Sequence, residues 1–170
     1  TFLMGWVSWL GAESVGVVLA LLNLLLVPFV QVAKTVVPEQ ILTLPILAAF
    51  AISLSHFLIL YGQKVKQPPL KMLAALVTAM SVQWTIARAV GKGLVEREQA
   101  FVVTAKGGRR KLGADFPAFW ETSIGAALAG SALLVGWTNW ERVTEIYLFA
   151  AVLAVQALPF LSATCVALFE

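Results

Sequence analysis

The sequence predicts an all-α polytopic membrane protein with about five transmembrane helices and one basic cytosolic loop. Of its 170 residues, 60% are hydrophobic and only 12% are charged, whereas a soluble domain carries about 25% charged residues. Its mean hydropathy is +0.88. Uncharged runs near the ~20 residues that a helix needs to cross a bilayer recur along the chain. Lipid, rather than water, is therefore expected to cover most of the surface.

The composition also excludes several classes of protein. Cys165 is the single cysteine, so no disulfide framework is available. Asp115 is the single aspartate, so the chain holds no cluster of catalytic aspartates. The high apolar content is incompatible with intrinsic disorder.

Residues 1–13 predict an interfacial helix or the tail of a truncated spanning helix. No charge precedes Glu13, and Trp6 and Trp9 suit the membrane interface. The segment has neither an initiating methionine nor a basic region followed by a cleavage site, so it does not resemble a signal peptide. We expect the chain to start within a longer protein.

Residues 14–92 predict three transmembrane helices, centred on the runs 14–33, 41–62 and 72–90. The third run reaches spanning length only when Arg88 is included. An arginine near a helix end is tolerated because its guanidinium can extend to the lipid headgroups.

Residues 93–120 predict a cytosolic loop, and residues 121–170 predict two further transmembrane helices at 122–139 and 146–169. Small residues recur on the first of these helices and predict a face for close helix contact. Ordinary membrane composition, in which glycine and alanine are common, explains them equally well. These small residues are Gly125, Ala126, Ala129, Gly130 and Ser131.

The distribution of basic residues sets the expected orientation, because basic residues concentrate on the cytoplasmic side. With five spans, one side collects Lys34, Arg88, Lys92, Arg97, Lys106, Arg109, Arg110 and Lys111. The other side collects Lys64, Lys66, Lys71 and Arg142. The first side is therefore expected to be cytosolic, which places loop 93–120 and the C-terminus in the cytosol of a multi-pass bacterial inner-membrane protein.

Few polar residues interrupt the apolar runs, and most are expected to hydrogen-bond to a neighbouring helix or to the preceding turn rather than to form a site. His56 has no His, Cys or carboxylate at metal-ligand spacing, which favours a buried, hydrogen-bonded histidine. Trp84 and Arg88 stand one helical turn apart and are able to form a cation–π pair. The polar residues in these runs are Asn23, Ser53, Ser55, His56, Gln83, Arg88 and Gln156.

The loop holds the most informative pattern. Phe101, Val102, Val103 and Thr104 favour an extended strand. The Thr104 hydroxyl and the Lys106 ammonium suit phosphate oxygens, and Gly107-Gly108 provides a hinge. A loop of this kind is able to close over an anionic nucleotide and withdraw. A basic loop placed only by the orientation rule, or one that binds anionic lipid headgroups, explains the same residues.

The run from Thr85 to Leu94, followed by F-V-V-T-A-K-G at residues 101–107, resembles the C-terminal membrane region of bacterial family 2 processive β-glycosyltransferases. The nearest group is the cellulose synthase and curdlan synthase type, in which an F-x-V-T-x-K motif lies on a cytosolic gating loop. The stretch from Glu121 to Ser162 is similar to the same group. The resemblance covers the second half of the chain, and the first half matches by hydropathy only.

The resemblance implies a membrane channel and gating loop of an enzyme that polymerises a β-glucan-type polysaccharide from a nucleotide sugar and translocates it across the inner membrane. Phe101, Val103 and Thr104 would contact the nucleotide, and Lys106 would lie near its diphosphate. No catalytic residue, metal ligand or cofactor is expected in this segment, and Mg²⁺ or Mn²⁺ is expected in the full-length enzyme. The implied partners are the nucleotide sugar, the growing polysaccharide and the lipid bilayer, with no nucleic acid.

The chain departs from this family in two ways. The family's D-x-D motif, its further catalytic aspartate and its Q-x-x-R-W motif are missing, because Asp115 stands alone and Gln83-Trp84 leading to Arg88 has a different spacing. We therefore expect this segment alone to be inactive. Three predicted spans also precede the loop where cellulose synthase places two, so either a helix is added or one of the three does not cross the membrane.

A non-enzymatic polytopic membrane subunit, such as a transporter component or an assembly scaffold, is the alternative function. A lipid-headgroup-modifying enzyme has less support, because no carboxylate or histidine cluster is evident in the sequence.

Overall fold

The fold is known from a computed structural model, which describes residues 2–33, 37–95 and 116–169. These residues form six α-helices and two short π-helical segments. In chain order they are α1 (Phe2–Ala33), η1 (Glu39–Thr43), α2 (Leu44–Ile59), η2 (Leu60–Val65), α3 (Pro69–Ser81), α4 (Gln83–Val95), α5 (Phe119–Trp137) and α6 (Thr144–Phe169).

Five helical segments are long and apolar enough to cross a membrane, which confirms the all-α polytopic fold class. Each overlaps one of the predicted apolar runs, with its ends shifted by a few residues. The five candidate spans are Leu10–Ala33, Gln40–Val65, Pro69–Val95, Phe119–Trp137 and Thr144–Phe169. The chain is thus a polytopic membrane protein by helix length and composition.

The N-terminal residues do not form a separate element. Residues 2–13, expected as an interfacial or truncated helix, continue without a break into the first span as part of α1. At the other side of the loop, α4 extends to Val95 and α5 begins at Phe119. Helical structure therefore enters both ends of the segment 93–120 that the sequence predicts as a loop.

Local sequence explains some of the helix ends. Pro45 and Pro69 stand in the first turns of α2 and α3, where a missing amide costs no hydrogen bond. Lys66 ends η2 with a left-handed backbone, φ 52°. The break between α3 and α4 at Val82 has φ −89° and ψ −5°, and no proline or glycine marks it.

The core lies where α1, α5 and α6 meet. Its fully buried side chains are Leu128 and Val135 of α5 and Phe149, Leu153 and Phe160 of α6, and α1 adds small residues such as Ala20. The Thr122 and Thr164 hydroxyls lie 2.8 Å apart across α5 and α6. These contacts fix α5 and α6 as an antiparallel pair with α1 packed against them.

Gly125 confirms part of the predicted small-residue contact. It is buried, and a Cβ placed on it would lie 3.0 Å from the Phe160 Cβ and 3.2 Å from the Leu161 backbone nitrogen. Ala129 also packs against the core. Ala126 and Gly130 are exposed, so the contact face of α5 follows Gly125 and Ala129 and does not include every small residue.

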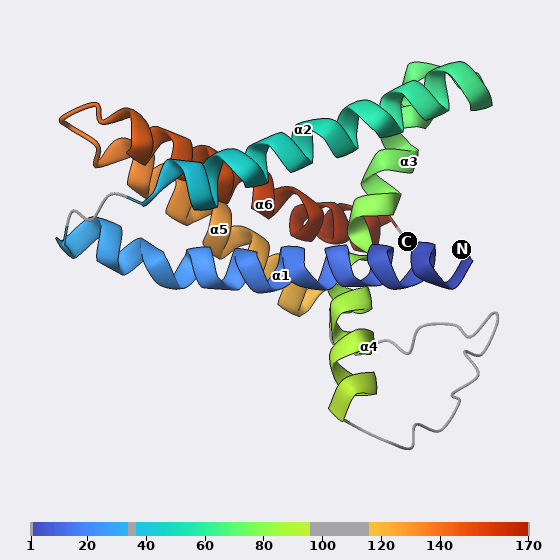
Figure 1. The fold of residues 1–170 in the computed structure, drawn as a ribbon, viewed down its shortest axis with the longest axis horizontal. Coiled ribbons are helices and arrows are strands. Elements are labelled where there is room, and N and C mark those ends of the chain that lie inside the picture. Colours follow the sequence, from blue (N-terminus) through green and yellow to red (C-terminus); the bar gives the residue numbers. More distant parts are fainter. Residues whose placement is uncertain (1, 34–36, 96–115, 170) are drawn as a thin grey trace.

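The helices do not all run in one direction. Figure 1 shows α1, α2, α5 and α6 extending lengthwise, whereas α3 and α4 run across them. The crossing is held by Ser162 of α6, whose hydroxyl lies 3.9 Å from the Met80 Sδ of α3, and by a contact between α4 and α1 described below. The transverse helix pair crosses the lengthwise helices and meets α1 at Glu13, so that the first residues of α1 extend past it.

Candidate functional site

An open cavity of about 500 Å³ lies between α1, α2, the α3–α4 pair and α6. Its size falls within the roughly 300–1,000 Å³ of ligand-binding pockets. Most of its lining is aliphatic or aromatic, with Leu19 on α1, Phe50 and Leu54 on α2 and Phe160 on α6. We call this cavity the groove.

Four polar side chains lie along the groove: Glu13, Ser53, Gln83 and Gln156. Glu13 is half-buried and is the only charged side chain among the described lining residues. An apolar pocket with a few convergent polar groups is the usual form of a small-molecule site. The groove is accordingly the best candidate for a functional site in the part of the chain that the structure describes.

Gly16 lets α4 approach α1 closely at one end of the groove. The Gln83 Nε2 donates a hydrogen bond of 3.4 Å to the Glu13 carbonyl oxygen. A Cβ at position 16 would lie 2.5 Å from the same nitrogen, which is closer than real Cβ atoms come. A glycine one turn after Glu13 is thus needed for Gln83 to reach the backbone of α1.

A buried pair of amides includes one residue that lines the groove, Gln156. Asn23 of α1 donates a hydrogen bond from Nδ2 to the Oε1 of Gln156 on α6, at 3.0 Å. Asn23 is only 2% exposed. In lipid-facing helices such a bond holds two helices together, because an unpaired amide in this environment is costly. The expectation that these residues bond across helices is therefore confirmed.

Pro159 of α6 also lines the groove. Proline has no amide hydrogen, so inside a helix it cannot donate to the carbonyl four residues earlier. That carbonyl belongs to Val155, and both residues line the groove. The Val155 carbonyl therefore does not receive the usual α-helical hydrogen bond from residue 159.

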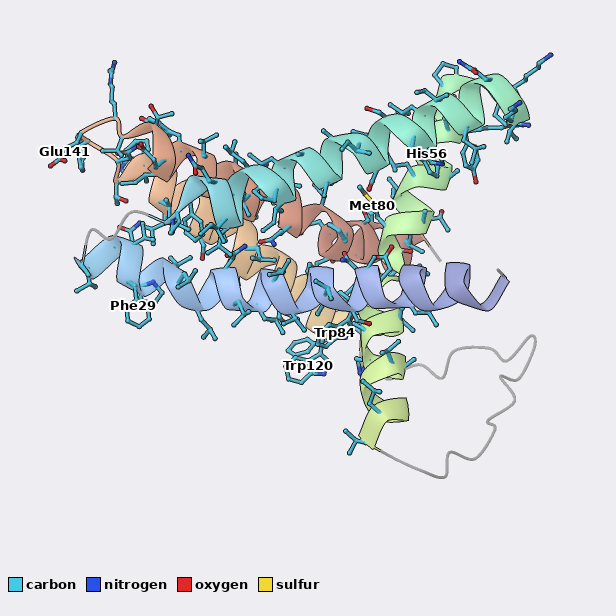
Figure 2. All side chains as sticks on the ribbon, viewed as in Figure 1. Phe29, His56, Met80, Trp84, Trp120 and Glu141 are labelled. Carbon is cyan, nitrogen blue, oxygen red and sulfur yellow. The ribbon has the colours of Figure 1, made fainter. Side chains whose placement is uncertain are left out.

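Three other residues that the sequence analysis singled out, His56, Trp84 and Arg88, do not line the groove. His56 and Arg88 are exposed on α2 and α4, so the expected burial of His56 is wrong. The Trp84 ring lies beside Phe160, with centroids 6.3 Å apart and an interplanar angle of 54°, and Figure 2 shows it near the crossing of α4 and α1. The Trp84 Nε1 is buried and has no hydrogen-bond partner among the described residues.

The predicted loop residues Phe101, Val103, Thr104 and Lys106 lie outside the described residues. Sequence reasoning did not identify Glu13, Gly16 or Pro159 as groove residues. A glycine and a proline inside apolar helices were the available signals, although neither indicates which neighbouring helix it faces.

Within residues 2–33, 37–95 and 116–169, no group of three or more His, Cys, Asp or Glu side chains is placed to hold a metal ion. No protein-family model matches the chain, and neither the curated proteins nor the solved structures gave a match.

Proposed function

We propose that this membrane protein forms the channel and gating-loop portion of a family 2 glycosyltransferase. The enzyme would polymerise a β-glucan-type polysaccharide from a nucleotide sugar and translocate it across the bacterial inner membrane. The observation that carries this proposal is the F-V-V-T-A-K run at residues 101–106, placed between two apolar helical segments.

The chemistry of the motif supports this assignment. Thr104 supplies a hydroxyl and Lys106 a cation, and both suit the oxygens of a diphosphate. In an extended segment Phe101 and Val103 would share one face and would be able to pack on a nucleotide. The bases that follow the motif add to the attraction for an anionic substrate.

The groove adds structural support. Its walls come from helices on both sides of the motif, α1 to α4 before it and α6 after it. It combines apolar and aromatic surface with spaced polar groups, which fits a sugar ring with its apolar faces and hydroxyl edges. The catalytic carboxylates and the divalent ion would belong to a domain other than this segment.

The test is made in membranes that contain the complete protein and its catalytic domain. Polymer formation is followed by incorporation of labelled sugar at limiting nucleotide sugar. Thr104→Ala and Lys106→Ala are expected to lower incorporation at least tenfold, mainly through the apparent KM. Lys111→Ala, which removes a nearby base outside the motif, is the matched control and should change incorporation less than twofold.

Unchanged incorporation in both motif variants would contradict the gating assignment. If membranes of the unmodified protein incorporate none of the nucleotide sugars tested, the alternative of a non-enzymatic membrane subunit is favoured.

A further inference from the structure

We infer that the α3–α4 pair lies along one face of the membrane on anionic lipid headgroups, so that the chain crosses the bilayer four times. The inference rests on the contacts between helices and on the charge pattern, and it is independent of the proposed function.

The first step is that α1 and α5 end on the same side. The Thr138 hydroxyl, directly after α5, donates a hydrogen bond of 2.9 Å to the Gln31 Oε1 near the end of α1. Val30, Gln31, Thr138 and Asn139 also line a shared hollow of about 230 Å³. A chain that leaves one side of the membrane and returns to the same side crosses the membrane an even number of times. One of the candidate spans between Gln31 and Thr138 therefore does not cross it.

Three candidate spans lie between Gln31 and Thr138 in the sequence: α2 with its π-helical ends, the α3–α4 pair, and α5. Exposed tryptophans mark α5 as a true span, because Trp120 and Trp137 lie at its two ends. They lie 17 positions apart in the sequence, or about 26 Å of helix, which is close to the thickness of the hydrocarbon core. Tryptophans at both ends are typical of a helix anchored at two interfaces.

The direction of the helices identifies α3–α4 as the candidate span that does not cross the membrane. Figure 1 shows α2 extending lengthwise with α1, α5 and α6, whereas α3 and α4 run across them. The transverse pair meets α1 at Glu13, through the Gln83 hydrogen bond. Glu13 lies close to the start of the candidate span Leu10–Ala33. The pair therefore lies at the level of one membrane face.

The surface of the pair fits this position. Polar or small residues recur at steps of three and four along its whole length, which is the spacing of one helical face. All are exposed except Ser81, which is partly exposed. They are Lys71, Ala74, Thr78, Ser81, Thr85, Arg88 and Lys92. A helix with one polar, basic face and one apolar face is typical of a segment that lies in the membrane interface.

The charge distribution indicates which lipid the pair contacts. With four crossings, every basic residue of the chain except Lys34 and Arg142 falls on the side of α3–α4. The excess of basic residues on one side is therefore larger than the eight against four that result from five crossings. It identifies the side of α3–α4 as the cytosolic side. Anionic headgroups attract lysine and arginine near a cytosolic membrane surface. Lys71, Arg88 and Lys92 supply those charges on the exposed face.

The number of crossings is measured with single cysteines in a Cys165→Ser background. The reporters are Ala33→Cys, Gln67→Cys, Leu94→Cys and Trp140→Cys, all at exposed positions. Intact cells are treated with a membrane-impermeant maleimide, and labelling is compared with that after solubilisation in detergent. Full labelling in detergent shows that each cysteine is reactive.

Four crossings place Gln67 and Leu94 together in the cytosol, and Ala33 and Trp140 together outside. We therefore expect labelling in intact cells at positions 33 and 140 only. Five crossings separate both pairs, so that one member of each is labelled. That result would overturn the inference.

A second measurement tests the depth of the pair and its lipid partner. Val82, 40% exposed, is the midpoint of Pro69–Val95, and a fluorophore on Val82→Cys reports its depth in reconstituted vesicles. In phosphatidylethanolamine–phosphatidylglycerol vesicles, spin labels on headgroups should quench it at least twofold more than labels deep in the acyl chains. Stronger quenching by the deep labels would contradict a surface position.

Replacement of phosphatidylglycerol by phosphatidylcholine removes the anionic lipid. The headgroup quenching is then expected to fall by about half. Unchanged quenching would overturn the assignment of anionic lipid as the partner.

Discussion

Asn23 and Gln156 form a buried hydrogen bond of 3.0 Å between α1 and α6. The bond joins helices from opposite ends of the sequence, and Gln156 also faces the groove. It therefore links the packing of the bundle to the shape of the candidate site.

Removing one member of this pair should destabilise the protein. Asn23→Ala leaves the Gln156 oxygen without its donor, and we expect a loss of about 0.5–2 kcal/mol in the free energy of unfolding. The measurement is unfolding in mixed detergent micelles. A double-mutant cycle with Gln156→Ala should give a coupling of about 0.6 kcal/mol, whereas exposed Ser55→Ala should change stability by less than about 0.5 kcal/mol.

Gly125 and Gly130 provide a matched pair on α5. Gly125→Ala places a Cβ 3.0 Å from the Phe160 Cβ, and overpacking of this kind costs about 1–3 kcal/mol. A Cβ on Gly130 meets nothing within 4 Å, so Gly130→Ala should be neutral or stabilising by up to about 1 kcal/mol. Thermal unfolding in detergent compares the two, and equal effects would contradict the described α5–α6 contact.

The approach of α4 to α1 depends on Gly16. Gly16→Ala should displace the Gln83 amide from the Glu13 carbonyl, because the new Cβ would lie 2.5 Å from its nitrogen. The amide is the flexible end of a side chain, so we expect a loss of only about 1 kcal/mol. The double variant Gly16→Ala/Gln83→Ala should lose less than the sum of the single variants. Strictly additive losses would show that the two residues do not meet, and Gly11→Ala is the control in open space.

Asn139 closes the turn between α5 and α6. Its Nδ2 donates to the Val143 carbonyl at 2.8 Å, and its Oδ1 accepts from the Val143 amide at 3.0 Å. Asn139→Ala removes both bonds and should cost about 1–3 kcal/mol. Asn139→Asp retains the acceptor and should cost less, as measured by thermal unfolding. If aspartate destabilises as much as alanine, the bond to the Val143 amide does not contribute.

The five apolar runs were predictable because their signal is local. A helix in lipid must satisfy its own backbone hydrogen bonds, so length and hydropathy suffice to locate it. The break at Val82 was not predictable in this way, since the sequence Ser81-Val82-Gln83 contains neither proline nor glycine. The transverse course of α3–α4 depends on contacts with α1 and α6, which are remote in the sequence.

The candidate site was predictable only in part. The interhelical role of Asn23 and Gln156 follows from the cost of an unpaired amide in lipid, although their pairing with each other does not. The sequence offers Arg88, one turn away, as a neighbour able to form a cation–π pair with Trp84. The contact between the Trp84 ring and Phe160 joins residues far apart in the sequence, and no local pattern predicts it.

The Asn23–Gln156 bond also has a consequence for biosynthesis. Its members are 133 residues apart, and ribosomes add about 5–20 residues per second. Asn23 must therefore wait roughly 7–27 s in the translocon or the bilayer before Gln156 is synthesised. During that interval other polar groups must satisfy its amide, so α1 reaches its final neighbours only after the last helix has been inserted.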